Sequence, residues 1–255
     1  MSKLTKVLSD KRKKTNSTQK STLIDRLATR HVIKKDPDSM LFGDLFIRVG
    51  DEGIEDFTGK HEIINARTQI ADELKDRDKS AVLKFDGLSS NINIPDDGTF
   101  IIGIDDFTID WWEYKLAIPK PNYEDIDSTQ YSLYKNSIDK KQPIKIRNTK
   151  YKSIYLSSDG DHWDIADDKY MGDVDEGKWV HWAVCRSNTN FYTFKNGEIK
   201  NIWSSDKGVN ISQGLLTIGS GPSGNYFYGF INKFRFTKGQ ALWTEEFDPE
   251  YDLFY

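Results

Sequence analysis

The residues of this sequence best suited to bind a cation are concentrated in one acidic segment. Eight carboxylates lie between residues 159 and 176, namely Asp159, Asp161, Asp164, Asp167, Asp168, Asp173, Asp175 and Glu176. Carboxylate oxygens are the ligands that Ca²⁺ prefers, so Asp159, Asp161 and Asp164 are candidate calcium ligands, and no other cofactor is expected. The spacing does not follow an EF-hand loop, because no glycine stands at the sixth position. The alternative is a solvated acidic loop on the rim of the fold.

Three aromatic residues are candidates for binding a sugar. Trp163 lies inside the acidic segment, and Tyr226 and Tyr228 follow the glycine-rich stretch Gly219–Gly224. Aromatic rings stack on the apolar faces of sugars, while carboxylates accept hydrogen bonds from sugar hydroxyls. We therefore predict a glycan-binding role for these three rings, with packing at an edge of the fold or against a partner chain as the alternative.

His181 and Cys185 are predicted to be buried rather than chemically active. Both lie in the largely apolar stretch Trp179–Arg186, and no second histidine stands at metal-ligand spacing. The stretch Gly219–Gly224 spells G-x-G-x-x-G but lies between two expected strands rather than before a helix. It predicts a turn, not a phosphate-binding loop.

The charge of the chain is divided unevenly along its length. The net charge of the 255 residues is −4, but residues 1–35 hold eleven basic and two acidic residues, a net charge of +9. The remainder therefore carries −13, which disfavours nucleic acid as a partner of the body. A cationic arm followed by an acidic body is typical of a tail that docks on a negative surface. The predicted partner-binding residues of this arm are Lys11, Arg12, Lys13 and Lys14.

The sequence also lacks several signals. No apolar run approaches the roughly 18 residues of a membrane-spanning helix, so we expect no membrane partner. Lys3, Lys6 and Asp10 interrupt the apolar residues near the first methionine, so no secretory leader is expected. The single cysteine excludes an intrachain disulfide and is typical of folding in a reducing cytosol.

The pattern of apolar residues predicts a mainly β fold preceded by an extended, partly helical arm. A weak helical pattern lies at Leu23, Ile24 and Leu27, and Ile63–Asp78 is predicted as a short amphipathic helix. Residues 120–150 are polar and contain Pro121 and Pro143, and are expected to form a long excursion over one rim. Predicted strands are Met40–Val49, Ala81–Phe85, Asn91–Ile94, Phe107–Lys115, Lys152–Ser157, Trp179–Arg186, Phe191–Lys195, Glu198–Trp203, Gly214–Ile218 and Phe227–Thr237.

Short strands at this spacing, without intervening helices, indicate an antiparallel two-sheet sandwich. The dipeptide Asn196-Gly197 predicts a tight hairpin between two of the strands, because both residues accept the positive φ angles of a type I′ turn.

Four stretches resemble the laminin-G-like domains with a concanavalin A-like jelly-roll fold, in the form common in tailed-bacteriophage virion proteins. They are Leu83-Lys84-Phe85-Asp86-Gly87 with Ile92-Asn93-Ile94-Pro95; Asp106–Trp112; Trp179–Arg186 continuing through Phe191–Gly197; and Leu216–Gly219 with Tyr226–Ile231 and Phe234–Thr244, closing at Phe247-Asp248-Pro249. The ending Thr-Lys-Gly-x-Ala-x-Trp-Thr-x-x-Phe-x-Pro carries most of the likeness. Where the family usually has two acids after Gly-x-Ile, this sequence has Asn232 and Lys233. The charge and apolar patterns predict a basic arm (1–35) and a connecting strand and helix segment (36–79), and the resemblance, which covers about residues 80–250, implies that the sandwich occupies residues 80–255.

One motif bears on catalysis. Endo-glucanases of this fold use Glu-x-Asp-x-x-Glu, and a retaining mechanism needs two carboxyls about 5–5.5 Å apart. Here Asp110 and Glu113 match, but Thr108 occupies the position of the nucleophile. No catalytic residue is therefore predicted.

The resemblance implies a non-enzymatic structural protein of a tailed-phage virion, as a decoration, fibre, tail or collar component anchored by the basic arm. Its partners would be other virion subunits in an oligomeric assembly, after synthesis in the host cytoplasm. The alternative is a glycan-binding adhesin module that recognises a cell-surface glycan, and an endo-glycosidase ranks third.

Overall fold

The computed structural model describes residues 44–50, 53–72, 81–118, 129–136, 141–222 and 224–249. These residues form sixteen strands and no helix, and they contain no helix long and apolar enough to cross a membrane. The basic arm with Lys11, Arg12, Lys13 and Lys14, and its predicted helical part, lie outside the described residues.

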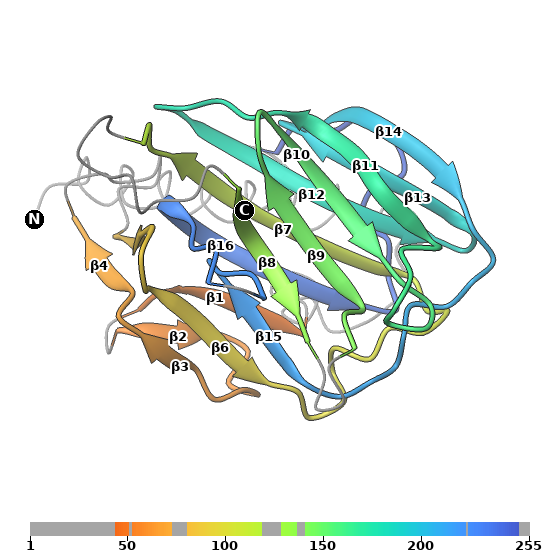
Figure 1. The fold of residues 1–255 in the computed structure, drawn as a ribbon, viewed down its shortest axis with the longest axis horizontal. Coiled ribbons are helices and arrows are strands. Elements are labelled where there is room, and N and C mark those ends of the chain that lie inside the picture. The colour runs from red at the N-terminus through yellow and green to blue at the C-terminus, as the bar shows by residue number, and fades with distance from the viewer. Residues whose placement is uncertain are drawn as a thin grey trace, which may run out of the picture. The chain divides into compact units, whose positions relative to one another are not determined.

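The strands form two antiparallel sheets (Figure 1). The order in the nine-stranded sheet is β14 (Glu198–Ser204), β13 (Asn190–Lys195), β12 (Trp179–Ser187), β7 (Phe107–Lys115), β16 (Tyr228–Lys238), β1 (Leu45–Val49) and β2 (Ile54–Asp56). In the same sheet β5 (Val82–Asp86) pairs with β16 and with β4 (Gln69–Ala71). The order in the seven-stranded sheet is β11 (Ala166–Asp173), β10 (Tyr151–Leu156), β9 (Ile144–Asn148), β8 (Gln130–Lys135), β15 (Leu215–Ile218), β6 (Asn91–Pro95) and β3 (Ile64–Ala66).

The hydrophobic core lies between the two sheets, because alternate residues of each strand point to the same side. Each strand of the core therefore contributes every second residue, as Phe107, Ile109 and Trp111 of β7 do opposite Ile144 and Ile146 of β9. In Figure 1, β8, β9 and β10 cross in front of β7 and β12.

β16 holds the nine-stranded sheet together. It pairs with β7 along one side, and along the other with β5 over Tyr228–Ile231 and with β1 over Phe234–Phe236. A bulge between Asn232 and Arg235 interrupts the pairing with β7, and Lys233 has a φ of 52° there. Asn232 and Lys233, which replace the acids usual in the resembled family, are thus bulge residues.

The C-terminal segment after β16, residues 240–249, packs on the outer face of the nine-stranded sheet and is called the tail below. Trp243 stacks on Phe247 with ring centroids 3.9 Å apart, and the His181 ring lies edge-on to both. The Thr108 hydroxyl donates to the Gln240 carbonyl at 3.0 Å and accepts from the Leu242 N–H at 2.8 Å. The Trp-Thr-x-x-Phe-x-Pro ending is therefore a packing motif, which covers the outer face of β7 and β12.

The predicted antiparallel sandwich is confirmed, and the ten predicted strands are found in β1, β5, β6, β7, β10, β12, β13, β14, β15 and β16 with small shifts at their ends. The hairpin between β13 and β14 is also confirmed. Asn196 and Gly197 have φ angles of 51° and 78°. His181 and Cys185 are fully buried, as predicted.

The predicted helix over Ile63–Asp78 is wrong for its described part, which forms β3 and β4 in different sheets. Asn65 and Thr68 clamp a turn between the two strands, with Arg67 at a φ of 61°. The edges of β6 and β5 offer backbone partners to this segment, and tertiary pairing outweighs a weak helical spacing. Residues 45–71 thus add four strands to the sandwich.

The predicted excursion over residues 120–150 is wrong where the structure describes it, because β8 and β9 lie in the middle of the seven-stranded sheet. The acidic segment likewise contains β11 rather than a single loop. These strands face the core on one side only, so polar residues alternate with apolar ones and lower the apparent hydrophobicity of the segment.

The tail packs so closely against Gly197, in the hairpin between β13 and β14, that there is no room for a side chain at this position. A Cβ there would overlap the Phe247 carbonyl oxygen, whereas a Cβ at Gly59, which also has a positive φ of 66°, would meet nothing within 4 Å. We expect Gly59→Ala to lower the free energy of unfolding by about 1–2 kcal/mol through backbone strain alone, and Gly197→Ala to lower it clearly more. Equilibrium urea denaturation followed by tryptophan fluorescence measures both, and equal losses would contradict the tail packing.

Burial lowers the pKa of His181 below its ordinary value of 6.5, against the opposing effect of the neighbouring Asp110. The unfolded chain therefore binds more protons below pH 6.5, so stability is lost as the pH falls through this region. We expect His181→Gln to flatten the fall in unfolding free energy between about pH 7 and 5. The exposed His162 donates a hydrogen bond to Asp159, which raises the pKa of His162, so its contribution to the pH dependence of stability has the opposite sign. A His162→Gln control that removes the same slope would refute this assignment.

Candidate functional site

The outer face of the seven-stranded sheet carries a group of aromatic and charged side chains, called the sheet-face cluster below. Its members are Lys145 and Arg147 of β9, Tyr151 and Tyr155 of β10, Trp163 of the following loop and Asp168 of β11. The alternation of β9 explains the position of the cations, because Ile144 and Ile146 point into the core. Lys145 pairs in register with Tyr155, and Arg147 with Ser153.

Asp168 is the anionic centre of the cluster. It stands at an irregularity in β11 with a φ of 49°. Its carboxylate accepts hydrogen bonds from the Tyr151 and Tyr155 hydroxyls, both at 2.6 Å, and from Arg147 Nη2 at 3.0 Å. Burial alone would raise the pKa of Asp168, but these donors outweigh it and lower that pKa to about 2. Burial and the bond to Asp168 raise the pKa of Tyr155.

Lys145 and Trp163 form the other half of the cluster. The Lys145 Nζ lies 4.3 Å from the ring centroid of Tyr155 and 4.3 Å from that of Trp163. The two rings meet edge to face with centroids 5.4 Å apart. Burial and the adjacent Arg147 lower the pKa of Lys145. The indole N–H of Trp163 donates no hydrogen bond to another described residue, so the polar edge of this half-buried indole has no partner in the described part of the chain.

The cluster continues as a row across the sheet. In register, Lys145 stands beside Tyr134 of β8, Tyr134 beside Thr217 of β15, and Thr217 beside Asn93 of β6. The Thr217 hydroxyl donates to the Asn93 side chain at 2.8 Å. Polar and aromatic residues thus extend over five neighbouring strands, counting Tyr155 of β10.

The three predicted glycan-binding rings are not brought together. Trp163 is part of the sheet-face cluster, whereas Tyr228 belongs to β16 of the other sheet, where it pairs with Asp86. Tyr226 lies in the loop after β15. Since β10 and β15 run in opposite directions, the loops that follow them leave opposite ends of the sheet.

The candidate calcium ligands Asp159, Asp161 and Asp164 make separate contacts instead of one ligand set. Asp159 accepts the N–H groups of Asp161 and His162 at 2.8 Å each, and Asp161 pairs with Lys141. Asp164 accepts from the Ser158 N–H at 2.8 Å and pairs with Lys207 at 2.9 Å. Within the described ranges no three His, Cys, Asp or Glu residues converge in a way that could hold a metal ion.

The catalytic motif candidates lie on opposite faces of β7. Asp110 points toward the tail and is bound by Arg235 Nε at 2.8 Å and by His181 Nε2 at 3.3 Å. Glu113 points into the sandwich, beside Trp111. The two carboxylates therefore do not flank a common space, and Thr108 is an anchor of the tail.

Glu113 belongs to a fully buried polar network that joins the two sheets. Lys152 Nζ of β10 donates to both Glu113 carboxylate oxygens, at 3.1 and 2.9 Å. The Ser132 hydroxyl and the Trp111 indole N–H also donate to Glu113, at 2.7 and 3.0 Å. Lys152 also donates to Asn148 Oδ1. Burial lowers the pKa of Lys152 to about 8, although Glu113 favours its charged form.

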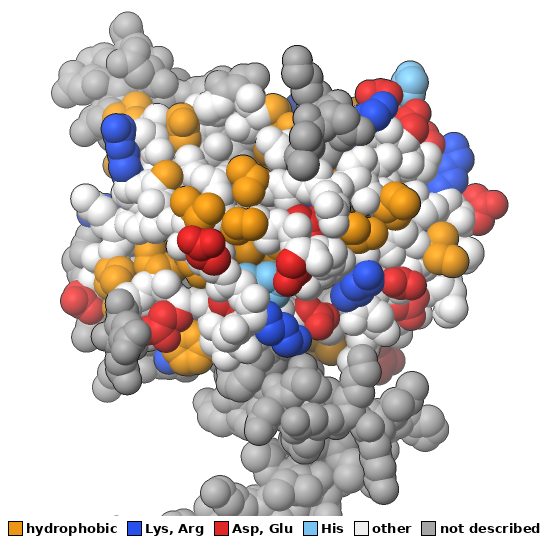
Figure 2. All heavy atoms as spheres, turned by 90° about the horizontal axis from the view of Figure 1, so that it is seen from below, with side chains coloured by type: hydrophobic (Ala, Val, Ile, Leu, Met, Phe, Trp, Pro, Cys, Tyr) orange, Lys and Arg blue, Asp and Glu red, His pale blue; other side chains and the backbone are white. Residues whose placement is uncertain are grey.

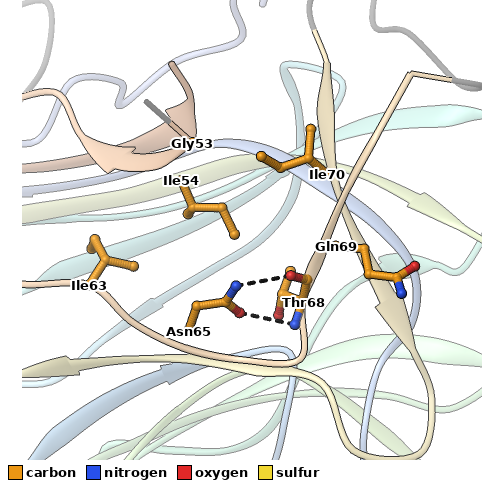
Figure 3. A pocket seen from close by; sticks show the side chains of 7 residues that line it. All are labelled: Gly53, Ile54, Ile63, Asn65, Thr68, Gln69 and Ile70. Carbon is orange, nitrogen blue, oxygen red and sulfur yellow. Dashed lines mark hydrogen bonds between the residues drawn. The ribbon is translucent and has the colours of Figure 1, made fainter. Parts of the chain in front are cut away.

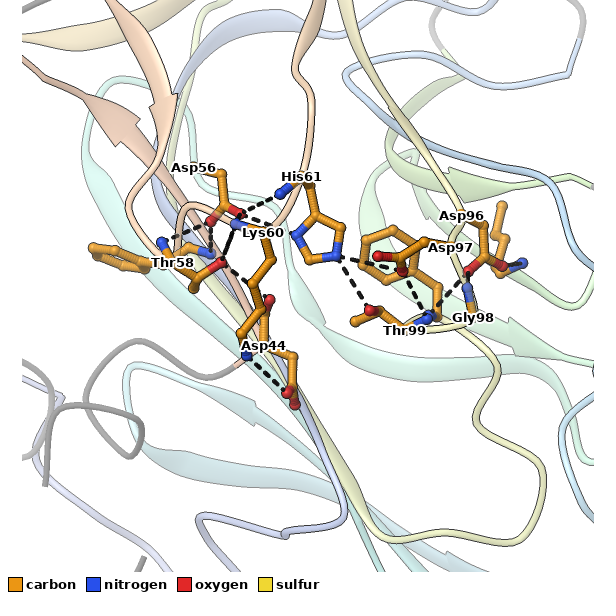
Figure 4. A network of polar contacts seen from close by, with 12 residues as sticks. Asp44, Asp56, Thr58, Lys60, His61, Asp96, Asp97, Gly98 and Thr99 are labelled. Atoms are coloured by element: carbon orange, nitrogen blue, oxygen red, sulfur yellow. Dashed lines mark hydrogen bonds and ion pairs between the residues drawn. The ribbon is translucent and has the colours of Figure 1, made fainter. Parts of the chain in front are cut away.

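A second polar network links β2 to the loop after β6 (Figure 4). His61 Nδ1 lies 3.0 Å from Asp56 Oδ2, and His61 Nε2 lies 3.2 Å from Thr99 Oγ1, the order of contacts found in hydrolase triads. The nearby N–H groups of Gly98, Thr99 and Phe100 are bound by Asp96 or Asp97. They are not free to stabilise an oxyanion, and the His61 ring is buried against Phe100. We interpret this network as structural.

A pocket of about 550 Å³ lies where β2, β3 and β4 meet (Figure 3). Ile54, Ile63 and Ile70 form its apolar walls, and Asn65 is bonded to the backbone of Thr68. None of its lining residues is aromatic or charged, so it lacks the groups that bind sugars.

The face seen from below in Figure 2 carries hydrophobic side chains in several small groups, with acidic and basic side chains between them. Interspersed charges of both signs are ordinary for a protein surface. This view therefore offers no single large apolar contact area.

Most of the sheet-face cluster is absent from the predicted site residues. Trp163 is among them, whereas Lys145 and Arg147 fall in the predicted polar excursion and Tyr155 in a predicted strand. The alternation Ile144-Lys145-Ile146-Arg147 is a signal that could have revealed a strand with two cations on its outer face. Nothing in the sequence alone brings Asp168 beside them.

Comparison with known proteins finds no matching protein-family model and no matching curated protein. Among solved structures, the binding domain of Paraclostridial Mosquitocidal Protein 1 matches 77% of this chain and 48% of its own, with a TM-score of 0.62 and 15% identity. The botulinum neurotoxin serotype G binding domain matches 82% of this chain and 49% of its own, with a TM-score of 0.58 and 13% identity.

Domain 4 of the arabinanase AbnA from Geobacillus stearothermophilus, solved with arabinotriose, matches 73% of this chain and 87% of its own, with a TM-score of 0.51 and 14% identity. The chain thus spans about half the length of the two toxin binding-domain chains. At these identities the likeness establishes the fold, a two-sheet antiparallel β-sandwich.

The Glu113–Lys152 pair gives a test of the buried network. Lys152→Met leaves a carboxylate buried without a cation, so we expect a loss of about 3–5 kcal/mol in the free energy of unfolding. The double variant Glu113→Leu/Lys152→Met removes both charges and should recover most of that loss. Urea denaturation of both variants measures this, and a double variant as unstable as the single one would disprove charge compensation.

Proposed function

We propose that this protein is a non-enzymatic carbohydrate-binding module whose binding surface is the sheet-face cluster. The observation that carries the proposal is the half-buried Trp163, set beside Lys145 and the Asp168 carboxylate on the outer face of a sheet. The fold supports it, since one similar structure is that of an arabinanase domain with arabinotriose and another that of a sialidase.

The chemistry of the cluster suits a saccharide. The Lys145 ammonium lies over the Trp163 ring, and the exposed part of the half-buried indole is the surface that we expect to contact a ligand. Sugar C–H groups stack on such a ring while hydroxyls exchange hydrogen bonds with nearby polar groups. Tyr134 and Thr217 of the adjoining row are buried, so the surface proposed to contact a glycan is centred on Trp163.

The proposal of a non-enzymatic role rests on the placement of carboxylates. Glycosidases need two carboxyl groups that face one glycosidic bond. Asp110 and Glu113 lie on opposite faces of β7, and each is bound to a buried cation. Neither is placed to donate a proton to a ligand on the sheet-face cluster.

The virion role remains a prediction that rests on the sequence resemblance. The closing motif that carries most of that resemblance packs the tail on the nine-stranded sheet. It is therefore a feature of the fold and not of a binding site. A glycan-binding sandwich is also compatible with a virion adhesin anchored by its basic arm.

Replacement of Trp163 tests the proposed function. On a glycan array of plant, bacterial and animal oligosaccharides, we expect the full-length protein to bind at least one class, and Trp163→Ala to weaken that binding about tenfold or more, as loss of a stacking aromatic anchor does. Phe57→Ala, which removes an exposed ring next to β2 that also has a cation, Arg48, over its face, is the control and should bind normally. The bound glycan should release no reducing sugar. Absence of binding to any glycan would disprove the module, and hydrolysis would disprove its non-enzymatic character.

A further inference from the structure

Lys145 is a half-buried cation without an anionic contact. Its ammonium lies over the rings of Tyr155 and Trp163, and no carboxylate of the described residues is within ion-pair distance. A cation that has lost part of its hydration is stabilised incompletely by ring faces. The position therefore favours an anion from outside.

The neighbouring Arg147 strengthens this preference. It stands two residues along β9 on the same face, and its guanidinium lies 4.9 Å from the centroid of the Tyr155 ring. Its Nη2 binds Asp168, while its Nε is buried and has no hydrogen-bond partner among the described residues. The two cations repel each other across Tyr155. Of the two, only Arg147 forms an ion pair with the Asp168 carboxylate.

Asp168 cannot supply the missing charge to Lys145. Its two oxygens already accept from Tyr151, Tyr155 and Arg147, and these bonds fix its position on β11. Asp167, the adjacent carboxylate, is exposed and acts on Lys145 only through its charge at longer range. The local arrangement is a fixed cation beside a half-buried indole.

We infer that the sheet-face cluster selects an acidic glycan, whose carboxylate or sulfate group binds the Lys145 ammonium while its sugar ring stacks on Trp163. This inference rests on the proposed function, and it names the substrate class of that site. The net charge of −13 outside the first 35 residues opposes long-range attraction of such a ligand. Recognition therefore depends on the short-range contact with Lys145, which is a charge-assisted hydrogen bond.

The experiment compares ligands that differ only in charge. Binding of the full-length protein is measured by isothermal titration with oligogalacturonate and with its methyl ester, with sialyllactose and its carboxyl methyl ester, and with a sulfated galactan oligosaccharide and its desulfated form. We expect the anionic member of at least one pair to bind about tenfold or more tightly than its neutral partner. The pair that responds distinguishes a carboxylate from a sulfate.

Two lysine variants assign the effect to its residue. Lys145→Met keeps an aliphatic chain over the rings and removes the charge, so it should abolish the preference for the acidic member of the pair. Lys169→Met is the matched control, because Lys169 of β11 also lies over a tryptophan, Trp203, with its Nζ 6.0 Å from the ring centroid. It makes the same change of charge and should keep the preference.

The outcomes separate the two proposals. Equal binding of acidic and neutral members, still abolished by Trp163→Ala, would overturn the acidic-glycan inference and leave the carbohydrate-binding function standing. A charge preference that survives Lys145→Met would also overturn it. Failure of every ligand, together with an empty glycan array, would overturn the proposed function itself.

Discussion

The burial of β7 on both of its faces is the constraint on which the rest of the structure depends. One face lies in the core between the sheets, and the other is covered by the tail. The strand nevertheless carries two carboxylates, and a buried charge must be compensated. Asp110 therefore requires Arg235 from β16, and Glu113 requires Lys152 from the opposite sheet. These two pairs fix the register of β16 and the stacking of the sheets.

The same constraint explains why the most recognisable parts of the sequence are structural. The tryptophan and phenylalanine of the closing motif exist to cover the outer face of β7 and β12, and Gly197 leaves room for the backbone of the tail. Thr108, which stands where a glucanase would have its nucleophile, receives and donates hydrogen bonds to that tail. The residues of β7 that resemble a catalytic strand therefore have a structural role, in packing and in buried hydrogen bonds.

The candidate binding surface lies on the seven-stranded sheet, which the tail does not cover. Its outer face has no tail of described residues, so the alternate positions of β9 and β10 are available for charged and aromatic side chains. Asp168 binds Arg147, Tyr151 and Tyr155 and fixes their arrangement. The Lys145 ammonium then has no carboxylate partner, and the Trp163 indole N–H no hydrogen-bond partner, among the described residues. A rigid platform with two such groups loses little entropy on binding a ligand.

The sequence by itself determined the all-β class, the antiparallel sandwich, the bounds of its most apolar strands and the hairpin at Asn196-Gly197. These follow from local properties, namely period-two alternation and the φ preferences of turn residues. Only the tertiary structure decided that Ile64–Ala66 and Gln69–Ala71 are strands, because their partners β6 and β5 lie elsewhere in the chain. The site shows the same division. Trp163 could be picked out from its type and setting, but its neighbours come from β9, β10 and β11. Their proximity depends on strand register and on a bulge at Asp168, which no local pattern encodes.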